Sequence, residues 1–251
     1  MVLTGVVEQK IMPDANTHKH YEAYVKNVQD FLIAEKELKR TINRALKTGK
    51  NQTVEIQTKL YALLYSTFSE SRFMKVILTP YGFEQFEVDE ILKQSSIIEK
   101  WLKCLELAFR KFNQTKKGSE IPNKKLELSR IIKTYVLNPS ILRNKIAHGQ
   151  LTVALNSKNT SLNATITNEI QTLDFVEISK WFVINKSLCD ILEELIESPN
   201  KGHFRNYYTR FQQLEAYILR TKDWTTESKM KTRKMKKLPP TTYIKNSGLG
   251  A

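Results

Sequence analysis

The sequence predicts an all-α protein built around one large helical domain. Glycine and proline are scarce, with 8 and 7 among 251 residues, which favours long helices over a β-sandwich or barrel. Apolar residues recur at helical spacing through most of the chain. The apolar content of 41%, with 11 Phe, 10 Tyr and 3 Trp, suffices for a substantial core. We therefore expect an all-α domain with one small β-hairpin or flap insertion.

Periodic apolar stripes divide this domain into successive helices, and Gly or Pro residues separate them. Gly49 follows the first stripe, residues 80–82 interrupt the chain after the second, and Gly149 suits the position just past a helix end. Asn138 and Pro139 resemble an N-cap and the first residue of a new helix. The expected helices span residues 20–46, 53–78, 87–112, 124–137, 139–148, 174–198 and 204–221.

Three regions depart from this helical pattern. Residues 151–170 carry two short β-prone runs around a turn-rich polar stretch, which predicts a β-hairpin or an extended flap. Residues 1–16 have no clear period and suggest a loose arm. Residues 222–251 are strongly basic and are expected to be disordered. The predicted organisation is a helical domain over residues 1–221 and a tail over residues 222–251.

The charge balance points to a polyanionic partner. Forty Lys and Arg residues against 26 Asp and Glu give a formal net charge of +14, which favours nucleic acid, although an anionic membrane surface would attract it too. No apolar run approaches the roughly 20 residues that a membrane span needs, so we expect no membrane-embedded segment. Half of the excess lies in seven cations beyond residue 227, where no acidic residue occurs: Lys229, Lys231, Arg233, Lys234, Lys236, Lys237 and Lys245.

The two cysteines, Cys104 and Cys189, lie far apart in the sequence, each on an apolar helical stripe. This placement favours buried thiols over a disulfide framework and fits a reducing cytosol. Residues 1–9 are too short and too polar for a secretory signal. A cytoplasmic protein is therefore expected.

Most familiar catalytic and metal-binding motifs are missing from the sequence. It has no Walker A loop, no G-x-G-x-x-G, no C-x-x-C pair and no H-E-x-x-H. His18 and His20 could be two metal ligands, but no third ligand lies near them, which favours exposed histidines. We expect neither a metal nor a cofactor.

One segment, Arg143-Asn144-Lys145-Ile146-Ala147-His148-Gly149, stands out. An Arg-x4-His pair alone is a weak signal, expected roughly 0.16 times by chance at this composition. Here Asn follows the Arg, Ala precedes the His, Gly follows it, and the whole lies on a predicted helix late in an all-α domain. The segment resembles the signature of the HEPN superfamily, which is an Arg, a polar residue that is often Asn, a few more residues and a His. The resemblance implies a HEPN-like antiparallel helical bundle with extra C-terminal helices, and a metal-independent ribonuclease. It transfers nothing onto residues 151–170 or the tail.

The chemistry of RNA cleavage explains why these residue types suit such a site. RNA carries its own nucleophile, the 2′-OH, so the protein need only transfer protons and stabilise a dianionic phosphorane. Histidine titrates near neutral pH and suits proton transfer, whereas arginine stays charged and binds two phosphate oxygens. The expected products carry 2′,3′-cyclic phosphate and 5′-OH ends.

Helix geometry limits what one copy of the motif can do. Five residues rotate an α-helix by about 140°, so Arg143 and His148 do not share a narrow face, whereas Asn144 and His148 do. One histidine also cannot easily act as base and acid on opposite sides of a phosphate. The HEPN resemblance implies a homodimer whose two motifs face each other across one cleft. His148 is then the general base or acid, and the His148 of a second copy takes the other role. Arg143 is the transition-state clamp, and Asn144 orients His148 or the phosphate by hydrogen bonding.

The resemblance also implies a biological setting. HEPN ribonucleases act in bacterial toxin–antitoxin and phage-defence systems, which implies tRNA, mRNA or rRNA as the target and an antitoxin or other regulatory protein as a partner. One alternative is a non-catalytic HEPN-like module that dimerises and binds RNA or a partner protein. The other is a purely structural helical protein, in which Arg143 pairs with an acid such as Glu127 and His148 complements the dipole of its helix.

Three further features are weaker candidates. Glu70 faces away from the apolar stripe of its helix, so it could enter a cleft, although a solvated charge is favoured. Tyr207 and Tyr208 could stack on bases, but the spacing of Phe204, Tyr208 and Phe211 favours core packing. The basic tail could bind RNA phosphates or serve only as a solubilising end.

Overall fold

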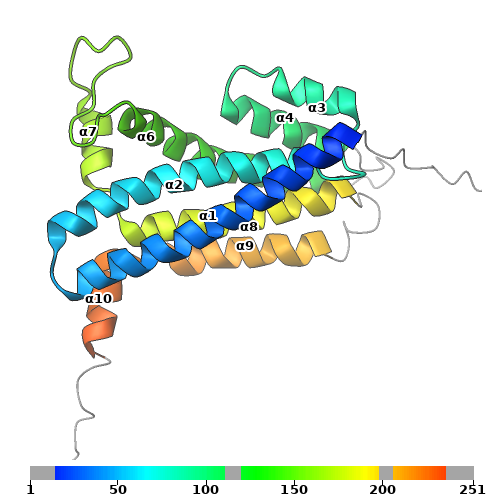
Figure 1. Ribbon diagram of the computed structural model, residues 1–251. Helices are drawn as coiled ribbons and strands as arrows, with labels where there is room; N and C mark the ends of the chain where they lie inside the picture. The colour runs from blue at the N-terminus through cyan, green and yellow to red at the C-terminus, as the bar shows by residue number, and fades with distance from the viewer. Residues whose placement is uncertain (1–14, 111–119, 198–205, 236–251) are drawn as a thin grey trace, which may run out of the picture.

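The computed structural model describes residues 15–110, 120–197 and 206–235, and helices make up most of these ranges (Figure 1). The prediction of an all-α protein is confirmed. Within the described ranges, no helix is both long enough and apolar enough to cross a membrane. The helices, in chain order, are α1 (Ala15–Lys47), α2 (Asn51–Ile77), α3 (Gln85–Leu92), α4 (Ile97–Arg110), α5 (Glu120–Ile132), the π-helical turn η1 (Lys133–Leu137), α6 (Asn138–Ala147), α7 (Ala164–Gln171), α8 (Phe175–Glu197), α9 (Tyr208–Thr221) and α10 (Thr226–Met235).

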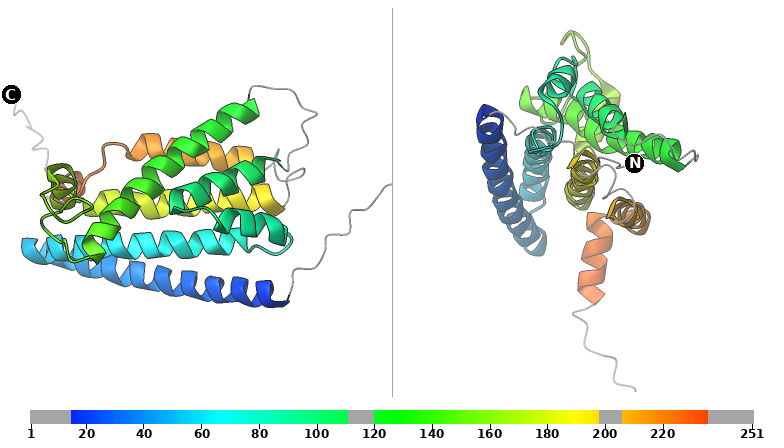
Figure 2. Two further views of the ribbon diagram at one scale, coloured as in Figure 1. Left: turned by 90° about the horizontal axis from the view of Figure 1, so that it is seen from above. Right: turned by 90° about the vertical axis from the view of Figure 1, so that its right-hand side faces the viewer.

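Four helices form one layer in the order α1, α2, α8 and α9, and the helices α3 to α6 cover another side of it (Figures 1 and 2). Two contacts show that α2 and α8 run parallel. The Asn185 amide donates to the Ser69 hydroxyl and, farther toward the C-terminus of both helices, Lys75 pairs with Glu193. After a tight turn at Gly49, whose φ is +69°, α2 runs back along α1. As a result, the C-terminal ends of α1 and α6 lie at the same end of the molecule as α10.

The core is densest between α2 and α8, where aromatic rings interlock. The ring of Phe182 lies 4.9 Å from that of Tyr61, 5.2 Å from that of Tyr65 and 5.1 Å from that of Phe68, measured between centroids. All four side chains are fully buried. Aromatic pairs at this spacing contribute attraction beyond the area that they bury, so this seam anchors the bundle.

The long helix expected over residues 87–112 is wrong in one respect, because the structure divides it into α3 and α4. Contacts between Ser96 and Glu99 explain this division. The carboxylate of Glu99 accepts from the Ser96 backbone N–H at 3.0 Å, and the Ser96 hydroxyl accepts from the Glu99 backbone N–H at 3.3 Å. This reciprocal arrangement is a capping box, which starts a new helix at Ile97.

A helix does begin at Asn138, with Pro139 in its first turn, but the N-cap expected at Asn138 is wrong, since α5, η1 and α6 follow one another without a break. Asn138 has helical torsions, with φ −58° and ψ −48°, and does not cap the helix. Pro139 has no N–H to donate to the carbonyl of Tyr135, and the π-helical turn makes room for its ring. The hydroxyl of Tyr65 donates to that Tyr135 carbonyl instead, which satisfies the group that the proline leaves unpaired.

The β-hairpin expected over residues 151–170 is not present, because the described residues form no strand. Only one antiparallel bridge, between Leu155 and Leu162, closes a polar loop. The second half of the segment is the helix α7, where Asn163 acts as N-cap and its side-chain oxygen accepts from the Ile166 N–H at 3.0 Å. The N-cap at Asn163 therefore favours a helix over residues 164–167, although the β-branched residues there favour a strand.

The prediction of a disordered tail is wrong for residues 226–235, which form α10. The Asp174 carboxylate caps the start of α8 and also accepts from the Thr226 N–H at 2.8 Å. The buried ammonium of Lys180 donates to the carbonyls of Thr221 and Trp224, at 3.1 and 3.3 Å. These contacts fix the turn between α9 and α10. The rest of the tail and most of the expected N-terminal arm lie outside the described residues.

Candidate functional site

The predicted motif lies on the last two turns of α6 and the turn that follows. Gly149 adopts φ +82°, a left-handed conformation that glycine reaches without strain, as expected for the residue after a helix cap. Its N–H donates to the Ile146 carbonyl, and the Gln150 N–H donates to the Lys145 carbonyl, both at 3.0 Å. This pair of bonds is a Schellman motif, and it places His148 at the C-cap of α6.

Arg143 reaches across to α2 rather than toward His148. Its Nη2 lies 3.0 and 3.2 Å from the two carboxylate oxygens of Glu70, and its Nη1 donates to the Asn144 side-chain oxygen at 3.0 Å. The pair is partly exposed, at 31% for the arginine side chain and 42% for the glutamate. Glu127, the partner expected for a structural Arg143, pairs with Arg130 instead. The structure therefore joins Arg143, Asn144 and Glu70 into one exposed polar cluster.

His148 lies on a different side of α6, at a pocket of about 580 Å³ that the loop after α6 helps to form. Among the described residues, its imidazole makes no hydrogen bond, and the side chain is exposed. The loop is held in place by Lys145, whose ammonium donates to the Leu155 carbonyl at 2.6 Å. Besides His148 and Asn144, the pocket is lined by Lys145, Gln150, Leu155, Ser157 and Asn159. These loop residues were not predicted from the sequence, because the β-prone runs of residues 151–170 indicated a flap with no assigned role.

An exposed stripe on α6 connects the two parts of the motif. Ile141, Asn144 and His148 follow the spacing i, i+3 and i+7, so they occupy one face of the helix, and all three are exposed. Leu142 and Ile146 are buried on the opposite side of α6, against α2 and α8. The motif thus combines an arginine held at the edge of α2 with a histidine on the outward face.

The other histidine and cysteine predictions agree with the structure. His18 and His20 are exposed, and the imidazole of His18 lies 3.4 Å from the carboxylate of Glu22 on the same helix. Cys104 and Cys189 are fully buried free thiols. In the parts of the chain that the structure describes, no group of three or more His, Cys, Asp or Glu side chains converges on a potential metal position.

The structure confirms the core packing expected for Tyr207 but not that expected for Tyr208. Tyr207 is fully buried and its ring lies 6.0 Å from that of Phe211, as expected for core packing. Tyr208, which the spacing also placed in the core, is 37% exposed, with the Lys124 ammonium 3.0 Å from its ring centroid. Phe204 lies outside the described residues.

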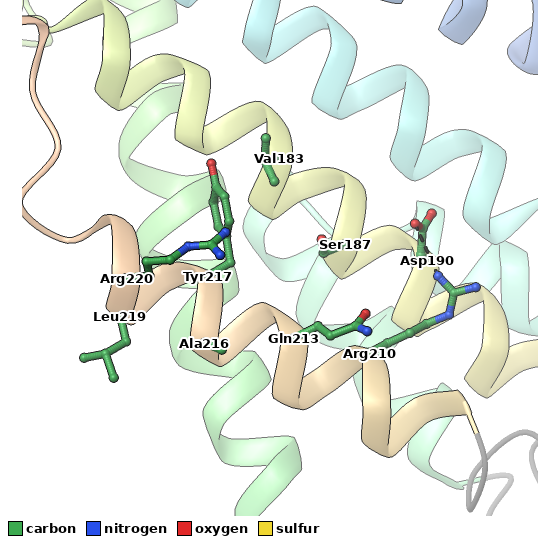
Figure 3. Close-up of a pocket in the computed structure, with 9 residues that line it drawn as sticks. All are labelled: Val183, Ser187, Asp190, Arg210, Gln213, Ala216, Tyr217, Leu219 and Arg220. Atoms are coloured by element: carbon green, nitrogen blue, oxygen red, sulfur yellow. Dashed lines mark ion pairs between the residues drawn. The ribbon is translucent and has the colours of Figure 1, made fainter. Parts of the chain in front are cut away.

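A larger groove lies between α8 and α9, far from α6 (Figures 1 and 3). Its volume is about 630 Å³, and Val183, Ser187 and Tyr217 contribute to its walls. The charges at one end are paired internally, since Arg210 lies 3.6 Å from Asp190 and 3.1 Å from Glu194. The other cation of the groove, Arg220, lies 5.8 Å from the Tyr217 ring centroid, and no imidazole is among the described residues that line the groove.

The motif is therefore an exposed site with one arginine, one amide and one imidazole, on two adjacent faces of a helix end. Such a site can bind an anion and transfer a proton. Comparisons of the chain with family models, curated proteins and solved structures found no match.

Proposed function

We propose that this protein is a metal-independent endoribonuclease of the HEPN type, which cleaves RNA as a homodimer through Arg143 and His148. The observation that carries the proposal is the placement of His148 at a rigid helix end, with its imidazole exposed at a pocket and the Arg143 cluster one turn away. The resemblance of the motif to the HEPN signature supplies the identity of the reaction.

In this proposal, Arg143 binds the non-bridging oxygens of the scissile phosphate. Glu70 engages its Nη2 and Asn144 accepts from its Nη1, so the Nε–H and a second Nη1 proton stay available to a ligand within these contacts. Glu70 thereby orients the guanidinium, which reduces the entropy lost when a phosphate binds. The side-chain oxygen of Asn144 accepts from Arg143, so Asn144 orients the phosphate through the arginine, and among the described residues no hydrogen bond joins it to the imidazole.

The proton transfers fall to His148. One imidazole removes the proton of the 2′-OH, the 2′-oxygen attacks phosphorus, and the P–O5′ bond breaks as the 5′-oxygen receives a proton. The products are a 2′,3′-cyclic phosphate and a 5′-OH, and no redox partner or added nucleophile is needed. Positioned acid–base groups of this kind contribute about 10²–10⁴-fold to a rate.

A homodimer supplies the second proton-transfer group. The face of α6 that carries Ile141, Asn144 and His148 is exposed, so a second copy packed against it would bring the two histidines toward one cleft. The substrate would be tRNA, mRNA or rRNA in the cytoplasm. A regulatory partner such as an antitoxin would restrain the activity, since an uncontrolled ribonuclease is toxic to its own cell.

The second candidate function is a non-catalytic module that dimerises and binds RNA or a partner protein. The ion pair between Arg143 and Glu70 favours it, because a carboxylate already neutralises the arginine that the reaction needs. The two functions differ in what removal of His148 does. A binding module keeps its activity without the imidazole, whereas the nuclease does not.

The test is cleavage of labelled tRNA and of a single-stranded RNA in EDTA by the unmodified protein, His148→Ala and His18→Ala. His18→Ala is the matched control, because it removes an equally exposed histidine from the opposite end of the bundle. We expect cleavage by the unmodified protein and by His18→Ala, and a loss of at least about 100-fold in His148→Ala. Equal cleavage by all three proteins would refute the assignment of His148, and RNA binding without cleavage would favour the non-catalytic module.

A further inference from the structure

A second cationic site lies where the end of α1 meets α10. A pocket of about 530 Å³ is lined by Arg40, Asn43, Arg44 and Lys47 of α1 and by Lys229 of α10. The four cations are exposed, and Asn43 is half-buried. No acidic side chain is among the described residues that line the pocket. The pocket therefore gathers positive charge from two segments that lie far apart in the sequence.

Helix periodicity in α1 and tertiary contacts of α10 together produce this convergence. Residues 40, 43, 44 and 47 follow the spacing i, i+3, i+4 and i+7, which places their side chains on one face of α1. Lys229 joins them because Asp174 and Lys180 hold the start of α10, as described above, and because its ammonium lies 4.7 Å from the Phe175 ring centroid. The fold thus orients the fourth cation as well as the other three.

The energetics of α1 alone do not account for this cluster. Cations near a helix C-terminus are stabilised by the helix dipole, which explains Arg44 and Lys47 in the last turn. That effect fades within one turn and does not extend to Arg40 or to Lys229 on another helix. Like charges four residues apart, such as Arg40 and Arg44, also repel one another. Glu37 pairs with Arg40 from outside the pocket, whereas Arg44 and Lys47 form no ion pair among the described residues.

We infer that this pocket binds phosphates of an RNA backbone, as a contact surface separate from the motif on α6. Arginine, lysine and amide groups that converge on one pocket are the groups that bind phosphodiesters, and they position RNA without reading its sequence. The pocket and His148 lie at the same end of the bundle (Figures 1 and 2), so one strand can contact both. The choice of RNA rests on the proposed function, whereas the phosphate chemistry rests on the pocket.

The experiment measures binding without cleavage, so that it stays informative if the proposed nuclease activity is absent. A fluorescent single-stranded RNA is titrated with full-length His148→Ala protein across about 50–200 mM salt. The test variant adds Arg44→Ala and Lys229→Ala. The control adds Lys26→Ala and Lys93→Ala, which removes the same charge from exposed positions on α1 and just after α3, toward the other end of the bundle. A second test variant, Arg44→Ala with Lys47→Ala, leaves the Lys229–Phe175 contact intact.

Both test variants are expected to bind RNA about 10-fold more weakly than the control, with the salt dependence of binding reduced by about 1.4 in slope for two lost phosphate contacts. Thermal unfolding of every variant shows whether the fold is retained. Equal losses in the test and control variants overturn the inference, as does the absence of RNA binding by the parent protein. Loss of binding to phosphatidylserine vesicles with unchanged RNA binding also overturns it, in favour of a membrane surface.

Discussion

Polar groups are buried and paired in the seam between α2 and α8, whereas they are exposed at the end of the bundle that carries α6. In the seam, Asn185 is fully buried and its amide donates to Ser69 at 2.8 Å among interlocked aromatic rings. At the end of the bundle, His148 is exposed, and Arg143 shares a half-exposed ion pair. Buried polar groups must be paired and therefore specify the fold, whereas exposed groups held by a rigid backbone remain free to meet a ligand. The comparison predicts that substitutions in the seam lower the stability of the fold, and that substitutions at the end of the bundle lower RNA binding or cleavage.

The largest effect on stability is expected from Phe182→Ala. This side chain is fully buried and contacts three aromatic rings of α2, so its removal leaves a cavity at the densest part of the core. We expect a loss of about 3–5 kcal/mol in the free energy of unfolding, measured by chemical denaturation. A loss below about 1 kcal/mol would show that the seam does not anchor the bundle.

Alkaline pH should weaken the same region without any mutation. Burial raises the pKa of Cys189 to about 12 and raises the pKa of Cys104, Tyr61 and Tyr65 above their ordinary ranges. In the unfolded chain, thiols ionise near about pH 8.5 and phenols near about pH 10. Stability is therefore complete below these values and falls as pH rises above them, because only the unfolded state then releases the protons.

The measurement for this prediction is the midpoint of urea unfolding between about pH 7 and pH 11. A double variant, Cys104→Ala with Cys189→Ala, should lose less stability between neutral pH and about pH 9.5 than the unmodified protein does. A midpoint that stays constant through the alkaline range would contradict the burial of these groups.

An intermediate effect is expected from Gly149→Ala, which strains the Schellman motif behind His148. Left-handed torsions disfavour a residue with a Cβ by about 1–2 kcal/mol, although open space surrounds this position. We expect a loss of about 1 kcal/mol in stability and a larger proportional loss in RNA cleavage, because the backbone that places the imidazole shifts. Gly149→Asn is the matched control, since asparagine tolerates this conformation, and it should retain both properties. Equal losses in the two variants would argue against a backbone effect.

The smallest effect on stability is expected from Glu70→Gln. The ion pair with Arg143 is partly exposed, so its loss should change the free energy of unfolding by less than about 1 kcal/mol. Under the proposed function, RNA cleavage should still fall, because the guanidinium loses the group that orients it. Glu127→Gln removes a comparable carboxylate that pairs with Arg130, and it should leave cleavage unchanged. If Glu70→Gln cleaves as well as the unmodified protein, Glu70 does not position Arg143.

The sequence predicted the elements whose signals are local and periodic. The stripe of α2 and the glycine at position 149 gave the helix and the C-cap geometry that the structure has. The N-cap at Asn138 was wrong because a contact distant in sequence, from Tyr65 to the Tyr135 carbonyl, offsets the effect of Pro139 and lets the chain continue in helical torsions. The break before Ile97 was predictable in principle, because Ser96 and Glu99 have the spacing of a capping box.

The candidate site was predictable only in part. The motif identified Arg143, Asn144 and His148, and it also indicated that Arg143 and His148 occupy different faces. It did not identify Glu70 as the partner of Arg143, because a separation of 73 residues carries no periodic signal. The stripe at Arg40, Arg44 and Lys47 could have been found from its spacing, but Lys229 joins it only through the tertiary position of α10.

The most direct test of the central claim is the chemistry of the RNA ends. The protein is incubated in EDTA with an RNA that it cleaves and with a fully 2′-O-methylated copy of the same sequence. The proposed mechanism predicts 2′,3′-cyclic phosphate and 5′-OH ends from the RNA, and no cleavage of the methylated copy, because the methyl group blocks the attacking oxygen. Cleavage of the methylated copy, or products with 5′-phosphate ends, would contradict the mechanism assigned to Arg143 and His148.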